Sequence, residues 1–177
     1  MIEGKRISLR RIRDEEECSR LYEIYNDLTE RALTDHDETY AIGPKLSAFR
    51  DHGMWTDDKG LLVVVNQANA ILGTISFIRT SDLECDIGYR ILRTADRGKG
   101  MMTEAVSLFC EHLFDRFPRI TRLQIRTAHD NEPSIRLAQR CGFTQEGVLR
   151  KAYAYRGRLC DCIVFGLLRD ECHAIET

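Results

Sequence analysis

The sequence predicts an α/β fold, a sandwich around one mixed and mostly antiparallel sheet. Two β-rich runs at 61–66 and 70–78 flank a short polar turn, which indicates a hairpin. A third β-rich run at 84–92 extends this hairpin into a meander. Beyond it, helical and extended patterns alternate in the order β-α-β-α-β-β, which favours helices packed on a single sheet.

The N-terminal third predicts one strand and at least one helix. Apolar and charged residues alternate through Ile7 and Leu9, as expected for a strand. Residues 14–28 begin with acids, which suit the positive end of a helix, and continue at helical spacing. The apolar stripe of this helix consists of Leu21, Ile24, Tyr25 and Leu28. Residues 29–55 predict short helices and loops, with a break near Gly43–Pro44.

In the C-terminal half, the residues that end helices and strands are clearer. A helix after residue 100 continues to Phe117, where Pro118 ends it. Its predicted core face consists of Met102, Val106, Phe109, Leu113 and Phe117. A strand follows, then a helix that Gly142 ends in a left-handed conformation, then two more strands. Their predicted ranges are 122–127, 131–142, 144–155 and 159–168.

Composition and charge limit the class of protein. The 177 residues, 43% hydrophobic and 31% charged, fit a single globular domain over 1–177. No apolar run approaches the roughly 20 residues of a membrane span. The N-terminal segment has charges where a signal peptide needs apolar residues, so we expect a cytoplasmic protein. The net charge of −2 disfavours a general nucleic-acid binder.

The seven cysteines predict neither a disulfide framework nor a metal site. Their number is odd and the context is not secretory, so we expect reduced thiols. Cys160 and Cys162 do not have C-x-x-C spacing, and no second pair has suitable spacing. The Asp-His-Asp run at 35–37 also lacks a partner cluster and is interpreted as a polar loop.

The stretch RGKGMMTEAV at 97–106 is the strongest sign of a ligand. The start of a helix offers unpaired N–H groups to an anion, and the two glycines let the backbone come close. Arg97 and Lys99 add positive charge. A P-loop is excluded because the Gly-Lys-Ser/Thr ending is missing. A dinucleotide fingerprint needs a third glycine where Thr103 stands, and the preceding strand belongs to a meander.

Four segments in order resemble the GNAT superfamily of N-acetyltransferases. Arg97-x-x-Gly100-x-Met102 resembles its acyl-CoA pyrophosphate loop, of pattern Gln/Arg-x-x-Gly-x-Gly/Ala. DNEPSIRLAQRCGF resembles the second motif, CDIGYRI the central strand, and EGVLR the strand after that helix. The resemblance covers most of 7–168 and is weakest over 29–55. It implies a single-domain GNAT-like sandwich whose central sheet is splayed.

The resemblance implies acetyl-CoA as co-substrate. Met102 departs from the Gly/Ala pattern, but the main-chain N–H makes the contact there. The implied coenzyme-binding residues are Arg97, Gly98, Lys99, Gly100, Met101, Met102 and Thr103 in the loop, Arg90, Ile91 and Leu92 beside the splay, and Asn131 and Ser134 on the later helix.

The catalytic groups are less completely implied. The tyrosine that many family members use as the acid is replaced here by Ala138. Ser134 matches a serine that the ribosomal-protein branch uses near the sulfur, although serine is also ordinary in a first helical turn. Asp86 and Glu84 share a face of the central strand and are base candidates, with a solvated edge as the alternative. Tyr153 stands where ribosomal-protein enzymes have a glutamate, which leaves the base open, with water as a relay.

GKGMMTEAV and EGVLRKAY look most like the branch of ribosomal-protein N-terminal (RimJ/RimL-type) acetyltransferases, which also includes enzymes for polyamines and antibiotics. Direct acetyl transfer to a protein N-terminal α-amine is therefore predicted, because that amine titrates roughly two units below lysine. A small-molecule amine and a non-catalytic acyl-CoA-binding module are the alternatives. The sequence leaves open whether the chain forms a homodimer. The predicted acceptor-binding residues are Asp35, His36, Tyr40 and Trp55.

Overall fold

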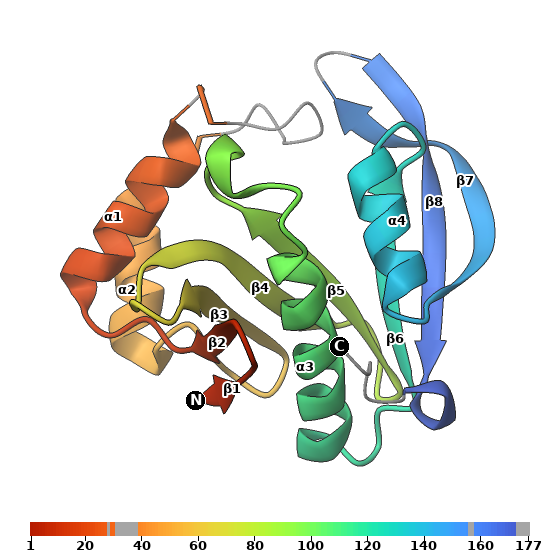
Figure 1. The fold of residues 1–177 in the computed structure, drawn as a ribbon, viewed down its shortest axis with the longest axis horizontal. Helices are drawn as coiled ribbons and strands as arrows, with labels where there is room; N and C mark the ends of the chain where they lie inside the picture. Colours follow the sequence, from red (N-terminus) through yellow and green to blue (C-terminus); the bar gives the residue numbers. More distant parts are fainter. Residues whose placement is uncertain (28, 31–38, 156–157, 173–177) are drawn as a thin grey trace.

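A computed structural model of the chain describes residues 1–27, 29–30, 39–155 and 158–172. These residues form one eight-stranded sheet in the order β1-β2-β3-β4-β5-β6-β8-β7 (Figure 1). Neighbouring strands are antiparallel except β5 and β6, which are parallel. The strands are β1 (Ile2–Glu3), β2 (Ile7–Arg10), β3 (Lys59–Asn66), β4 (Ile71–Arg79), β5 (Glu84–Ile91), β6 (Arg122–Ala128), β7 (Thr144–Tyr155) and β8 (Arg158–Leu168). The predicted mixed α/β fold is confirmed.

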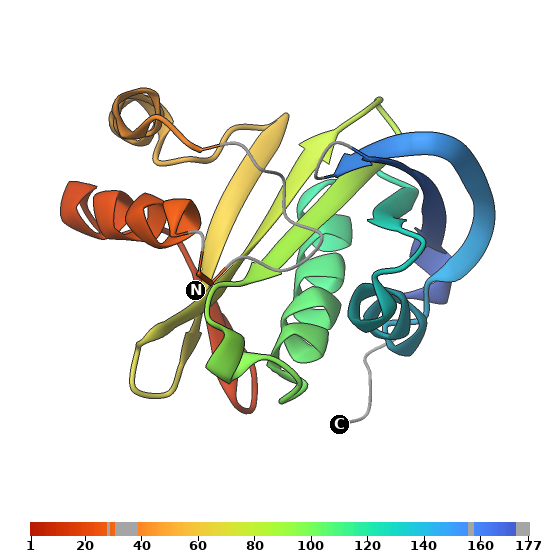
Figure 2. The ribbon, with the colours of Figure 1, turned by 90° about the horizontal axis from the view of Figure 1, so that it is seen from above.

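Helices cover the two faces of the sheet (Figures 1 and 2). The helices α1 (Glu15–Asn26) and α2 (Ile42–His52) pack on one face, and α3 (Met101–Arg116) and α4 (Glu132–Arg140) pack on the other. Strand β3 is buried on both sides, with Leu62 and Val64 facing the α3 cluster and Val63 and Val65 facing the α1 cluster. Among the described helices, none is long and apolar enough to cross a membrane.

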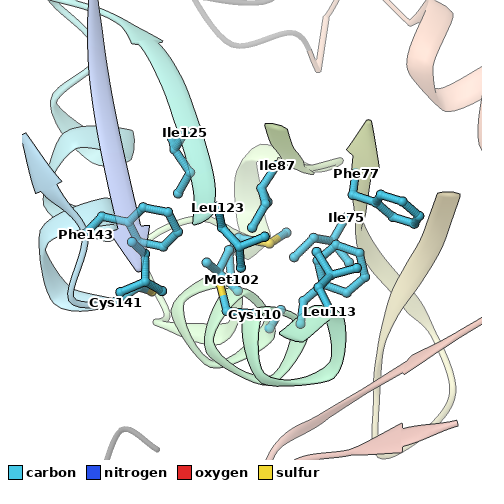
Figure 3. Packing of buried hydrophobic residues seen from close by; sticks show 14 of the residues in the cluster. Ile75, Phe77, Ile87, Met102, Cys110, Leu113, Leu123, Ile125, Cys141 and Phe143 are labelled. Carbon is cyan, nitrogen blue, oxygen red and sulfur yellow. The ribbon is translucent and has the colours of Figure 1, made fainter. Parts of the chain in front are cut away.

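Helix α3 supplies the centre of the larger core (Figure 3). It begins and ends within a residue of its predicted range. Met102, Val106, Phe109 and Leu113 are buried as predicted, and Phe117 packs against the cluster at its edge. These side chains contact Ile75, Ile87 and Leu123 of the sheet, among others, so helical spacing and strand alternation meet in one core.

The two N-terminal helices differ in detail from the prediction. In α1 the buried stripe begins about one turn earlier than predicted. Of the predicted residues, Ile24 and Tyr25 are only half-buried and Leu28 lies outside the described residues. The buried residues are Glu17, Cys18, Leu21 and Tyr22. The predicted break at Gly43–Pro44 is wrong. Both residues lie in the first turn of α2, where the missing proline N–H has no intrahelical acceptor in any case.

A buried ion cluster ties α1 to the sheet. The Arg10 guanidinium donates two hydrogen bonds of 2.8 Å to the Glu17 carboxylate. The backbone N–H and the guanidinium of Arg13 donate to the same group at 2.9 Å. The side chains of Arg10 and Glu17 are only 10% and 9% exposed. The Arg10 hydrogen bond, together with those from Arg13, outweighs burial and lowers the pKa of Glu17 from 4.5 to about 2.

Replacing Glu17 with glutamine should therefore destabilise the protein at neutral pH by about 3 kcal/mol. A folded-state pKa below the unfolded value stabilises the fold above about pH 4.5, and the stabilisation is lost as the pH falls through about 2. Urea unfolding should show a gap between wild type and Glu17→Gln that narrows between pH 5 and pH 2.

The exposed Glu16 pairs with Arg20 and provides the control. Glu16→Gln should cost less than about 1 kcal/mol at every pH. A gap for Glu17→Gln that stays constant with pH would contradict the assigned pKa.

Candidate active site

Strands β5 and β6 lie side by side at one end only. Their parallel register covers Glu84–Asp86 against Arg122–Gln124. In contrast, β5 continues along β4 to Ile91, and β6 continues along β8 to Ala128. Each strand is held on its outer side, and the two spread apart beyond the shared register (Figure 1). This is the splay that the resemblance implies.

One of the three backbone positions predicted beside the splay faces the gap. The N–H of Leu92 donates to the carbonyl of Leu72 at 2.9 Å and therefore points towards β4. The backbone groups of a strand alternate in direction, so those of Arg90 also point towards β4 and those of Ile91 point into the gap. The Ile91 N–H is thus the one of the three that could meet a carbonyl oxygen lying in the splay.

The glycine stretch forms a tight entry into α3. After the short 3₁₀ helix at Thr94–Asp96, Gly98 and Gly100 adopt left-handed conformations with φ of 74° and 73°. Gly100 is the N-cap and provides no side-chain cap, so the N–H groups of residues 101–103 have no intrahelical acceptor. Three such groups and the positive end of the helix dipole fit a pyrophosphate.

The two cations of this stretch are held by protein partners. The Arg97 guanidinium donates to the carbonyl oxygen of Glu30, whose carboxylate accepts the N–H of Thr94 at 2.7 Å. The Lys99 Nζ lies 3.3 Å from Asp96 Oδ1. The described contacts thus direct the Arg97 side chain to the chain that follows α1. The anion site that remains is made mainly of backbone.

A hydroxyl pair bridges the splay. Tyr89 Oη of β5 and Ser134 Oγ in the first turn of α4 lie 2.7 Å apart. Burial raises the pKa of Tyr89 strongly, so its hydroxyl is protonated and can donate. Asn131 is the N-cap of α4, and its Oδ1 accepts the N–H of Ser134 at 3.4 Å. Ser134 is thereby fixed opposite the central strand.

Comparison with known proteins decides the family. Residues 6–144, more than half of the chain, match the family model of the acetyltransferase (GNAT) domain. The chain belongs to the GNAT acetyltransferase family. It is 32% identical over 111 residues to the uncharacterized N-acetyltransferase p20 of Bacillus licheniformis, a match that covers 62% of this chain and 61% of p20. It is 26% identical to the probable N-acetyltransferase YjcK of Bacillus subtilis, over 97% of this chain and 98% of YjcK.

Solved structures share the fold of this GNAT protein. The ribosomal L7/L12 α-N-protein acetyltransferase RimL, in complex with coenzyme A, superposes with a TM-score of 0.77 at 20% identity, covering 95% of this chain and 97% of RimL. A spermidine N-acetyltransferase from Vibrio cholerae, in complex with coenzyme A and spermine, gives 0.78 at 16% identity, covering 93% and 96%. The family makes this chain an acetyl-CoA-dependent acyltransferase, and these two likenesses show the fold alone.

Both acids of the central strand of this GNAT protein bind basic or amide groups of β6. Asp86 accepts from Arg126 at 2.5 Å and from Gln124 at 2.9 Å. Glu84 accepts from Arg122 and Thr80, each at 2.7 Å. Burial alone would raise the pKa of Glu84, but these hydrogen bonds and the two arginine charges together lower it. Glu84 also lies at the closed end of the splay, so the structure argues against the predicted role of Glu84 as a base.

The late hairpin flanks the open end of the splay (Figure 1). Tyr153 lies on β7 opposite Cys160 of β8, just after a bulge that begins at Leu149. In this bulge Lys151 has a φ of 53°, and its N–H donates to Asp161 Oδ1 at 2.9 Å. The predicted Tyr153 therefore lies near the tip of the late hairpin, on a strand whose path is set by the bulge.

A mixed cluster of metal-ligating groups lies at the end of β6. His129, Asp130 and Cys160 bring a ring nitrogen, a carboxylate oxygen and a sulfur within 4.8 Å of one another. The side chains of His129 and Asp130 are exposed and that of Cys160 is half-buried. The sequence offered no signal for this cluster, because Cys160 is about 30 residues away from the other two along the chain.

The predicted acceptor-binding residues are dispersed. Asp35 and His36 lie outside the described residues. The ring of Tyr40 packs edge-on against Tyr25 and at a tilt against Tyr22. Its backbone N–H donates to Asn26 Oδ1 at 2.7 Å, so it fastens α1 to the segment before α2. The tyrosine cluster lies over β4 and β5, where Tyr25 Oη pairs with the Thr74 hydroxyl.

The predicted acceptor-binding residue Trp55 packs against the core. Its ring lies 5.0 Å from that of Phe77 and 6.4 Å from that of Phe109, so it packs against the core near the second half of α3. A side chain at Gly60 would collide with the indole, which explains the glycine opposite Trp55 in the bridge between them. Trp55 therefore lies at the end of α3 that is remote from the glycine stretch.

Two residues of the site were missed from the sequence, Tyr89 and Arg6. The alternation of Cys85, Ile87 and Tyr89 places a tyrosine on the core face, and a buried tyrosine hydroxyl usually has a partner. That signal was available. Arg6 contacts the glycine stretch from 93 residues away, which no local pattern reveals.

Proposed function

We propose that this GNAT acyltransferase acetylates the α-amino group of a protein N-terminus, as the RimJ/RimL branch does. One observation carries the choice of amine. Both carboxylates of the central strand, Asp86 and Glu84, are engaged in ion pairs with arginines of β6, so neither is free to accept a proton from the amine. An α-amine loses its proton near pH 8, roughly two units below an alkylamine, and needs least help.

The coenzyme site that we propose comprises the N–H groups of residues 100–103, Ile91 beside the splay, and Ser134. When bound, acetyl-CoA supplies a thioester whose carbonyl carbon accepts the amine and whose sulfur leaves as thiolate. The Ile91 N–H is placed to donate to the thioester oxygen as it gains charge. Pantetheine in the splay would pass between β5 and the start of α4, which Tyr89 and Ser134 bridge.

The reaction moves two protons, one away from the amine and one to the leaving sulfur. The amine loses one proton, through water, on becoming the amide nitrogen. Ser134 Oγ donates its proton to the departing sulfur, and the Tyr89 hydroxyl donates to Ser134 as its oxygen gains charge. Tyr89 then recovers a proton from solvent. Ala138, which replaces the usual tyrosine, is fully buried against the core and cannot take part.

The pH dependence should follow the amine. For an N-terminal peptide, kcat/KM should rise about tenfold per pH unit up to roughly pH 8 and then level off, because only the neutral amine attacks. With spermidine the rise should continue towards pH 10. Steady-state rates from pH 6 to 10 measure this difference. A plateau well below pH 7 for both amines would reveal a strong base and contradict the assignment.

A panel of amines tests the choice of substrate. N-terminal peptides, spermidine and an aminoglycoside should be compared by release of free thiol, and a ribosomal fraction should be examined by mass spectrometry for acetylated N-termini. Acetylated N-termini support the proposal. Acetylated spermidine or antibiotic alone overturns it in favour of the small-molecule alternative, and coenzyme binding without any thiol release favours a non-catalytic module.

A further inference from the structure

We infer that Arg6 is a positioning residue for the phosphate end of coenzyme A, an inference that rests on the coenzyme site proposed above. Arg6 lies just before β2, far from the glycine stretch in sequence. Its Nη1 donates to the carbonyl oxygen of Lys99 at 3.1 Å, and its Nη2 donates to that of Gly100 at 3.2 Å. One planar guanidinium thus holds two successive carbonyl groups.

This contact sets the direction of the N–H groups on the other side of the chain. In a trans peptide the C=O and the following N–H point in opposite directions. The described chain has no cis peptide bond. Because the Lys99 and Gly100 carbonyls are turned towards Arg6, the N–H groups of Gly100 and Met101 are turned away from it. Those two groups are therefore presented at the open entry of α3.

Arg6 is itself held in place by Glu104 in the first turn of α3. Its Nε donates to Glu104 Oε2, and its backbone N–H donates to Glu104 Oε1, both at 2.9 Å. The Glu104 side chain is only 7% exposed. Burial raises the pKa of Glu104, but these hydrogen bonds outweigh burial and lower it, so the carboxylate is charged. The start of β2, the glycine stretch and α3 are thereby joined through one arginine.

The role requires the forked geometry as well as the charge. Lysine would keep the positive charge and could still pair with Glu104, but a single ammonium group cannot hold two carbonyls in the fixed arrangement of a guanidinium. Arg6→Lys therefore separates positioning from simple attraction of an anion. It also leaves the buried Glu104 with a cationic partner, so the variant should fold.

Calorimetry with coenzyme A is the test. Arg6→Lys should weaken the Kd about tenfold, which corresponds to the loss of roughly one charge-assisted hydrogen bond. The KM for acetyl-CoA should rise while the KM for the amine stays constant. The ratio of kcat/KM for acetyl-CoA to that for S-acetylpantetheine, which lacks the pyrophosphate, should fall about tenfold. Arg50→Ala removes a similarly exposed arginine paired with Glu15 and should change none of these values.

Each other result overturns the inference. If Arg6→Lys binds coenzyme A as tightly as wild type, charge alone suffices and the positioning role is wrong. If Arg6→Lys lowers kcat/KM by the same factor for acetyl-CoA and for S-acetylpantetheine, Arg6 supports the fold in general and not the phosphate end of the site. If the wild-type protein does not bind coenzyme A, the proposed coenzyme site fails, and the inference fails with it. If wild type, Arg6→Lys and Arg50→Ala all bind coenzyme A with the same Kd, the proposed function stands but the positioning role of Arg6 is rejected.

Discussion

Replacing Ser134 with alanine is expected to lower kcat for acetyl transfer by about 10- to 100-fold with little change in the KM for acetyl-CoA. A proton donor acts mainly when charge develops on the leaving sulfur, so its loss affects the transition state more than the bound substrate. The hydroxyl is also fixed for this role by Tyr89 at 2.7 Å and by its place one turn from the Asn131 cap. Steady-state kinetics with a fixed amine measure the effect.

Tyr89→Phe and a double variant refine this prediction. Removing the tyrosine hydroxyl should lower kcat by a smaller factor, because Ser134 remains but loses its partner. In the Ser134→Ala background the same change should have almost no further effect, since the two hydroxyls act through each other. Ser107→Ala is the matched control, because this half-buried helical serine donates to the carbonyl of Thr103 in its own helix. It should retain wild-type kcat.

Wild-type turnover by Ser134→Ala would make Ser134 an ordinary first-turn residue of α4. If Tyr89→Phe and Ser134→Ala each lower kcat and their factors multiply in the double variant, the two hydroxyls do not act through each other. If Ser134→Ala raises KM and leaves kcat unchanged, Ser134 serves binding only. A lower melting temperature for Ser134→Ala but not for Ser107→Ala would point to a structural cause.

The elements that local patterns define strongly were predicted well. In α3, apolar spacing from Met102 to Leu113 and Pro118 after its end left little freedom, and the structure agrees. In contrast, Pro44 was interpreted as a break although a proline in the first helical turn is tolerated. Trp55 stands among polar residues and was predicted to bind the acceptor. Its burial depends on Phe77 and Phe109, which arrive from β4 and α3.

The site was predictable where it consists of backbone and obscure where it depends on distant side chains. Gly98 and Gly100 predicted a close approach of the backbone to an anion, and the structure adds that both residues are left-handed. The pairing of Glu84 with Arg122 joins strands that are almost 40 residues apart, and it changed a base candidate into part of an ion pair. Whether such a carboxylate is free to act as a base or is already ion-paired can be predicted only when the neighbouring strand and its register are known.

Gly100→Val is expected to weaken coenzyme A binding by on the order of 10- to 100-fold. Gly100 has a φ of 73°, which costs a β-branched residue about 1–3 kcal/mol, and a factor of ten corresponds to 1.4 kcal/mol. Its Cβ would point towards the Arg6 guanidinium, 3.5 Å from Nη2, so the larger valine would also press on the contact that holds the Lys99 and Gly100 carbonyls. The entry of α3 would relax by turning these peptide groups, and the N–H groups would no longer converge on one anion.

Calorimetry with coenzyme A measures the loss of affinity in Gly100→Val. Gly43→Ala, in the first turn of α2 where a Cβ meets nothing within 4 Å, is the control and should bind as wild type does. Wild-type affinity in Gly100→Val would move the pyrophosphate away from this helix start.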